Sequence, residues 1–116
     1  MDGCIFCRIQ KGEIPSEKVY EDETFLVIRD IHPAAPVHLL LIPRRHFRDV
    51  LEMGHDPEGP AVAAAMARAL PAVAEAAGLP LGGFRILTNC GPEAGQTVMH
   101  LHYHLLGGRV LGERLL

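Results

Sequence analysis

The sequence predicts an α+β domain in which a mainly antiparallel, five-stranded sheet packs against one long helix. Three observations lead to this prediction. Short aliphatic or alternating stretches bounded by turn residues recur along the chain. One long Ala-rich run carries apolar residues at helical spacing. The 116 residues, 48% of them hydrophobic, suit a single modest core. We therefore expect one domain over residues 1–116.

The first half of the chain supplies a short helix and three strands. Residues 4–11 are expected to form a helical turn that ends at Gly12. A turn follows, because Pro15 forces the preceding residue out of the α region. Strands are expected at 19–21, 25–28 and 37–42, and Pro43 closes the third because it lacks a backbone donor.

The second half of the chain supplies the long helix and two more strands. A short helix is expected at 47–52, and a second start signal follows at Asp56-Pro57-Glu58. The long helix should run from there to about Ala77 and stop at Gly78. Pro71 should bend this helix or break it into two. Strands at 83–89 and 99–106 complete the sheet.

The last predicted strand contains three alternating histidines, His100, His102 and His104. Successive strand residues point to opposite faces, so the three imidazoles should share one face and the intervening Leu101, Tyr103 and Leu105 the other. Histidine is a common acid, base and metal ligand. The strand is therefore a candidate active-site element, although a merely solvated histidine-rich face is the alternative.

The residues around this strand resemble one family. Asn89 and Gly91 precede Gly95-Gln96-Thr97-Val98, which lead into the histidines. The earlier matching segments are Cys4 to Ile9, Gly12 to Pro15, Val19 to Asp22, Asp30-Ile31, Pro36, His38 and Ile42 to His46. This order resembles the histidine-triad (HIT) nucleotide-binding family from about Cys4 to Arg109, and Leu106 to Arg109 point to its Hint-like, zinc-binding bacterial type. The resemblance implies the HIT-like fold and a homodimer formed through the long helix and a central strand.

The resemblance also implies a reaction at the α-phosphorus of a nucleotide. It assigns His102 as the nucleophile of a nucleotidyl-histidine intermediate and His104 as a phosphate ligand or proton donor. Thr97, Asn89 and the backbone around Gly95 and Gln96 would support the developing charge. The expected enzyme is a hydrolase, a purine nucleoside phosphoramidase. The alternatives are a dinucleoside polyphosphate hydrolase, from which Gly107-Gly108-Arg109 leans away, and a regulatory nucleotide-binding module with little turnover.

The nucleotide itself is assigned to a second set of residues by the same resemblance. Asp30 would accept hydrogen bonds from two ribose hydroxyls, although on its own it is an ordinary strand-end aspartate. The residues expected to sandwich the base are Phe6, Ile14, Ile28 and Ile31, each of which could equally be core.

A structural zinc site is the third expectation. Cys4 and Cys7 offer two thiolates, and a tetrahedral ion needs two more ligands. The resemblance supplies His46 and His100. Free thiols or a redox pair are the alternatives for the cysteines. His38 is a rival ligand, but in a strand it should point away and bond backbone. A catalytic zinc held by all three triad histidines is a further alternative, which would leave the cysteines without a role.

Charge and composition limit the partners and the cellular compartment that we expect for this protein. A net charge of −3 argues against a broad nucleic-acid surface, and no apolar run is long enough to cross a bilayer. Three cysteines fit a reducing compartment better than a disulfide scaffold, so a cytoplasmic protein is expected. Cys90 is expected to be buried and inert, and His32 and His55 to be solvated.

Overall fold

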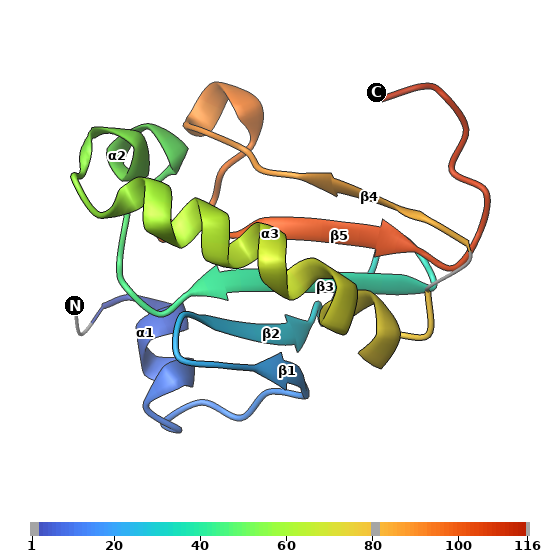
Figure 1. Ribbon diagram of the computed structural model, residues 1–116, viewed down its shortest axis with the longest axis horizontal. Helices are drawn as coiled ribbons and strands as arrows, with labels where there is room; N and C mark the ends of the chain where they lie inside the picture. Colours follow the sequence, from blue (N-terminus) through green and yellow to red (C-terminus); the bar gives the residue numbers. More distant parts are fainter. Residues whose placement is uncertain (1–2, 80–81, 116) are drawn as a thin grey trace.

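The computed structural model describes residues 3–79 and 82–115, and Figure 1 shows its elements. The helices are α1 (Ile5–Gln10), α2 (Val50–His55) and α3 (Gly59–Ala76), with one 3-10 turn, η1 (Pro92–Ala94). The strands are β1 (Lys18–Glu21), β2 (Phe25–Arg29), β3 (Val37–Pro43), β4 (Phe84–Leu87) and β5 (Tyr103–Gly107).

The five strands form one antiparallel sheet in the order β1-β2-β3-β5-β4. The long helix α3 lies across one face of this sheet (Figure 1). The predicted α+β fold is therefore confirmed. Pairing of β3 with β5 places Leu40 opposite His104 and His38 opposite Leu106, which brings two histidines from distant parts of the chain together.

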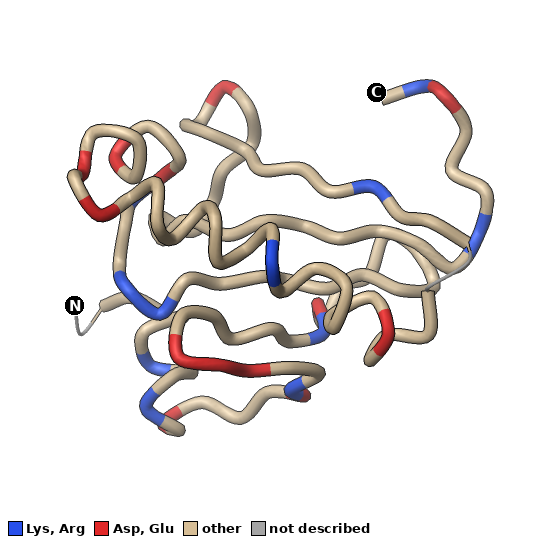
Figure 2. Tube along the Cα trace, viewed as in Figure 1, with Lys and Arg blue, Asp and Glu red and all other residues tan. Residues whose placement is uncertain are grey.

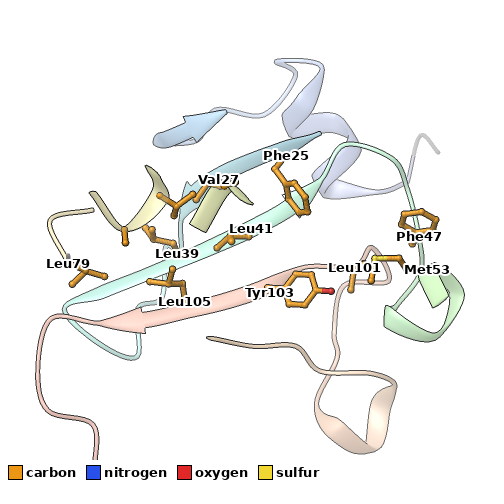
Figure 3. Close-up of a cluster of buried hydrophobic side chains, with 13 residues drawn as sticks. Phe25, Val27, Leu39, Leu41, Phe47, Met53, Leu79, Leu101, Tyr103 and Leu105 are labelled. Atoms are coloured by element: carbon orange, nitrogen blue, oxygen red, sulfur yellow. The ribbon is translucent and has the colours of Figure 1, made fainter. Parts of the chain in front are cut away.

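The two faces of the sheet carry different apolar clusters. Toward α3, alternate residues of the central strands pack with Ala69 and Val73 of the helix (Figure 3). These strand residues are Phe25, Val27, Leu39, Leu41, Tyr103 and Leu105. On the other face, Leu26, Ile28, Leu40 and Ile42 pack against Phe6 and Ile9 of α1. The short helix α1 thus covers the face that also carries the histidines.

The start of the long helix differs from the prediction. The Asp56 carboxylate accepts the Glu58 N–H at 2.8 Å and so closes a turn, and α3 begins only at Gly59. A glycine is needed there, since a Cβ would lie 1.7 Å from the Met53 carbonyl oxygen. Pro71 lies inside one continuous helix, so the alternative of two helices is wrong.

Three other elements are shifted or shorter than predicted. The helix predicted at 47–52 begins at Val50, because the Asp49 side chain caps it by accepting the Glu52 N–H at 2.9 Å. The strand predicted at 83–89 is β4, which ends at Leu87. The strand predicted at 99–106 begins only at Tyr103, because Leu101 N–H donates to the Phe47 carbonyl at 2.7 Å rather than joining the sheet.

Formal charges avoid the centre of the sheet. Neither β3 nor β5 contains a Lys, Arg, Asp or Glu residue, as the uncoloured strands of Figure 2 show. The polar side chains of these two strands are His38, Tyr103 and His104, so hydrogen bonds rather than lysines and arginines of the same strands decide which ring nitrogen of a histidine carries a proton. No helix within 3–79 and 82–115 is long and apolar enough to span a membrane.

Candidate active site and metal cluster

The histidines lie on the sheet face that α1 covers. His38 is in β3 and His104 in β5, whereas His100 and His102 belong to the extended segment that leads into β5. Leu101, Tyr103 and Leu105 are buried in the cluster on the other face. The predicted alternation therefore persists in the side chains even though the strand itself is shorter.

His102 presents one free ring nitrogen. Its Nδ1 lies 2.8 Å from the carbonyl oxygen of His100, which can only accept, so Nδ1 carries the proton and Nε2 keeps its lone pair. Burial lowers the pKa of His102, which favours the neutral ring. The Phe6 ring packs edge-on against it, with 5.0 Å between ring centroids. This neutral, oriented imidazole is suited to act as a nucleophile.

His104 has the opposite arrangement. Its Nδ1 lies 2.9 Å from Nε2 of His38, and His38 Nδ1 accepts the Ala34 N–H at 3.0 Å. Neutral His38 therefore carries its proton on Nε2 and donates it to His104 Nδ1. His104 must then hold its own proton on Nε2, which makes it a donor. Burial and the two neighbouring histidines lower the pKa of His104.

His38 is the site residue that sequence analysis missed. The prediction that it bonds backbone is confirmed by the Ala34 N–H. Its second nitrogen, however, contacts His104, and this contact depends on the register between β3 and β5. The period-two spacing from His38 to Leu40 and Ile42 predicts that His38 lies on the same sheet face as these two residues. It does not predict that His104 is its hydrogen-bond partner.

Asp30 lies beside this pair of histidines. Its Oδ1 accepts the His32 N–H at 2.7 Å, and its Oδ2 lies 3.4 Å from His38 Nε2. The carboxylate is largely buried, with 18% of its side chain exposed. The structure therefore joins the residue predicted to bind ribose to the histidine that contacts His104.

The loop before the histidines is held by Gln96. This buried side chain accepts the Gly91 N–H at 2.8 Å and donates to the carbonyls of Arg48 and Val98. The backbone N–H of Gln96 donates to the Gly91 carbonyl, and Gly95 turns the chain with φ of 88°. Gln96 thus shapes the loop, while the exposed Gly95 lies at its surface.

Thr97 and Asn89 lie on either side of this loop. Thr97 is exposed and lines a shallow hollow with Cys4 and His46, and Asn89 is half-buried just beyond β4. The neighbouring Thr88, which the sequence did not single out, donates its hydroxyl to the His102 carbonyl at 2.8 Å. This bond attaches the end of β4 to the histidine segment.

Three of the four residues assigned to the base lie together. Phe6 and Ile28 are buried in the cluster beneath α1, and Ile14 packs against it. Ile31 differs from them, because 86% of it is exposed. An apolar floor therefore lies next to His102, whereas Ile31 is exposed in the loop after Asp30 and is not part of that floor.

Cys4, Cys7, His46 and His100 form a compact cluster in which the four potential ligand atoms all lie within 4.8 Å of one another. Cys4 Sγ is 3.3 Å from His100 Nδ1, and Cys7 Sγ is 3.4 Å from His46 Nδ1. Tetrahedral zinc with ordinary bond lengths would separate sulfur and nitrogen ligands by roughly 3.6 Å. The cluster therefore has the size and the donor set for a zinc ion.

The surroundings of the cluster also fit a cation. His100 Nε2 donates to the Pro43 carbonyl at 2.8 Å, which leaves Nδ1 free to bind a metal. Burial lowers the pKa of His100 to about 4, so the ring is neutral. Burial and the adjacent Cys4 raise the pKa of the Cys7 thiol, so a bound cation would favour its thiolate form.

A second group, Asp30, His38 and His104, is equally compact but does not fit a metal. The His38 nitrogen that faces the group must carry a proton, because the other accepts the Ala34 N–H. The alternative of a catalytic zinc held by all three triad histidines also fails. His100 directs Nδ1 toward the cysteines and Nε2 to the Pro43 carbonyl, so it has no nitrogen left for a site shared with His102 and His104.

This fold and this arrangement of histidines define a known class. The HIT domain matches residues 11–111, so the chain belongs to the HIT family. Protein HitA of Neisseria gonorrhoeae is 46% identical over 107 residues, which cover 92% of this chain and 97% of that protein.

Solved structures agree with this assignment. A HIT family hydrolase from Clostridium thermocellum superposes with a TM-score of 0.93 and 46% identity, covering 100% of this chain and 99% of that one. A histidine triad protein from Clostridium difficile gives a TM-score of 0.89 and 39% identity, with 98% and 96% covered. The family resemblance stated from the sequence is therefore confirmed.

Proposed function

We propose that this protein is a hydrolase that transfers a nucleotidyl group from a nucleoside phosphoramidate to His102 and then to water. The observation that carries the proposal is the opposite proton placement on neighbouring rings. His102 offers a lone pair at Nε2, and His104 offers a proton at Nε2. Their ring centroids are 5.2 Å apart, close enough to act on one phosphoryl group. A similar protein described as a HIT family hydrolase supports the reaction class.

In the first step, the His102 Nε2 lone pair attacks the α-phosphorus. A bond forms between nitrogen and phosphorus, and the bond from phosphorus to the leaving amine breaks. The electron pair of that bond goes to the amine nitrogen, which takes the proton from His104 Nε2. The negative charge left on the His104 ring is balanced by the positive charge that the nucleotidyl group places on the neighbouring His102 ring. The His100 carbonyl holds the Nδ1 proton of His102 throughout, and so stabilises the positive charge that the substituted ring acquires.

In the second step, water attacks the nucleotidyl group on His102. One water proton returns to His104 Nε2, the new phosphorus–oxygen bond forms, and the electron pair of the nitrogen–phosphorus bond returns to His102. The products are an amine and a nucleoside monophosphate. Both histidines are then restored to their starting states.

The rest of the nucleotide would occupy the groups around the histidines. Asp30 would accept two ribose hydroxyls, and Thr97, Asn89 and the Gly95 backbone would face the phosphate, with Gln96 fixing their loop. The base, for which we propose a purine, would lie on the apolar floor. That floor comprises Phe6, Ile14 and Ile28, with Ile31 folding over the base from the solvent side.

We also infer that Cys4, Cys7, His46 and His100 hold a structural zinc ion. Bound there, zinc would supply a cross-link between α1 and the histidine segment, with no position left for chemistry. The His100 side chain would bind the ion, and the His100 backbone carbonyl would accept the hydrogen bond from His102 Nδ1. The three unpaired cysteines suit a reducing setting, and we propose a cytoplasmic one.

We further propose a homodimer formed through α3 and the open β4 edge. A mostly apolar hollow there is lined by Ala67, Leu70, Pro71, Ala74, Glu75 and Phe84. Phe84 keeps 37% of its surface exposed. A second copy of the chain would cover these groups. The family resemblance implies contact through the long helix, which is α3, and a central strand, and we extend the proposed contact to the edge strand β4.

The proposal is tested by replacing the nucleophile. His102→Ala should lower turnover of adenosine 5′-phosphoramidate by about a thousandfold or more, while adenosine monophosphate still binds. His55→Ala, which removes an exposed histidine at the end of α2, is the matched control and should keep full turnover. Unchanged turnover in His102→Ala would refute the proposal, and preferred turnover of a dinucleoside polyphosphate would favour the alternative hydrolase.

A further inference from the structure

The hydrogen bonds of His38 connect the proposed ribose site to the proposed proton donor. His38 is 8% exposed, and its Nδ1 is occupied by the Ala34 N–H at 3.0 Å. Its Nε2 faces two groups at once. His104 Nδ1 lies 2.9 Å away, and Asp30 Oδ2 lies 3.4 Å away. We call these residues the Asp30–His38–His104 chain.

Neutral His38 has one proton for these two acceptors. A second proton cannot enter at Nδ1, because it would meet the Ala34 N–H. The carboxylate carries a full negative charge and attracts the shared proton more strongly than a neutral nitrogen at the same distance would. Asp30 and His104 therefore compete for the hydrogen bond from His38.

The outcome of this competition decides what His104 can do. When His38 donates to His104 Nδ1, the His104 proton must be on Nε2, where the proposed reaction needs it. When His38 turns its hydrogen bond toward Asp30, His104 Nδ1 loses its donor. The His104 proton can then move to Nδ1 and bond the carboxylate, which leaves a lone pair where the leaving amine needs a donor.

Ribose hydroxyls would shift this balance. Two hydroxyl donors on the Asp30 carboxylate would satisfy its acceptor sites and weaken its attraction for the His38 proton. His38 would then donate fully to His104. We propose that Asp30 controls the proton placement on His104 through His38, so that ribose binding accelerates cleavage of the phosphorus–nitrogen bond in addition to improving affinity.

This inference rests on the proposed function and makes His38 a positioning residue. It is tested with two substrates, adenosine 5′-phosphoramidate and its 2′,3′-dideoxy counterpart. The measured quantity is the single-turnover rate constant for nucleotidyl transfer to His102 at saturating substrate. For the unaltered protein, the ribose substrate should react about tenfold faster, the effect expected of one charge-assisted hydrogen bond.

Asp30→Asn is the informative variant. The amide oxygen can still accept the His32 N–H, but the amide nitrogen cannot accept from His38, so His38 is left with His104 as its acceptor. The dideoxy substrate should therefore react faster in Asp30→Asn than in the unaltered protein, and the ratio of the two rate constants should approach one. Glu23→Gln makes the same chemical change at an exposed turn and should keep the tenfold ratio.

A second measurement uses the unaltered protein without reaction. The ¹⁵N chemical shifts of His104 distinguish which ring nitrogen is protonated. Adenosine should increase the Nε2-protonated form, and 2′,3′-dideoxyadenosine at saturation should not. Equal shifts with both nucleosides, or equal saturating rate constants in the unaltered protein, would overturn the coupling while the His102 adduct still formed. If neither substrate labels His102, the proposed function fails and the inference fails with it.

Discussion

Two histidines two residues apart acquire different roles from their hydrogen-bond partners. The His100 carbonyl fixes the proton of His102 at Nδ1, and a hydrogen bond donated by His38 places that of His104 at Nε2. The alternation of the triad was readable from the sequence, because it follows from strand geometry. The placement of protons was not, because it depends on which strand lies beside β5 and in which register.

Burial of these rings predicts the pH dependence of turnover. The nucleophile must be neutral, and burial lowers the pKa of His102 below the ordinary histidine value of 6.5. Activity should therefore be more than half-maximal at pH 6.5, rise to its full value above that pH, and decline as the pH falls through the lowered pKa. The measurement is kcat/KM for adenosine 5′-phosphoramidate from pH 4 to 8. A half-maximal point above pH 6.5 on the acid side would contradict this account.

At the scale of elements, the short helix α1 has the largest influence on the site. α1 carries Cys4 at its N-cap, Cys7 in its first turn and Phe6 between them, so its N-terminal end and its buried face both meet the histidine segment. Only six residues form this helix, which is too short to be stable alone. Its position must therefore come from packing and, when present, from the bound ion.

Removing one thiol should show this dependence. Cys7→Ala should abolish stoichiometric zinc binding and lower the melting temperature, because three ligands cannot complete a closed tetrahedral site. Cys90→Ala removes the third cysteine, which lies outside the cluster, and should change neither quantity. The measurements are metal content after purification and thermal unfolding. Full metal content in Cys7→Ala would exclude the four-ligand site.

The order of the α-helices and strands was predictable, and two of the errors share one cause. The apolar periods correctly placed β1, β2, β3 and the long helix within a few residues. The start of α2 and the start of β5 were wrong because Phe47 and Leu101, which read as parts of a helix and a strand, instead pair with each other through one backbone hydrogen bond. Such long-range pairing of irregular segments leaves no local pattern in the sequence.

At the scale of the whole molecule, the proposed dimer contact through α3 and β4 can be tested by placing a charge in it. Leu70→Arg would place a charge in the apolar hollow between α3 and β4, so we expect it to convert a dimer into a 12.7 kDa monomer. Ala72→Arg adds the same charge at an exposed position elsewhere on α3 and should leave the dimer intact. Light scattering on the eluting protein measures both. A monomeric unaltered chain, or a dimeric Leu70→Arg, would contradict the proposed interface.

The account as a whole depends on transfer of a nucleotidyl group to one ring nitrogen. The most direct measurement is rapid acid-free quenching of the protein with adenosine 5′-phosphoramidate, followed by mass spectrometry of its peptides. The account predicts an adenylyl group on the peptide that contains His102 and none in His102→Ala. An adduct on another residue, or hydrolysis that proceeds with no adduct on His102, would contradict it.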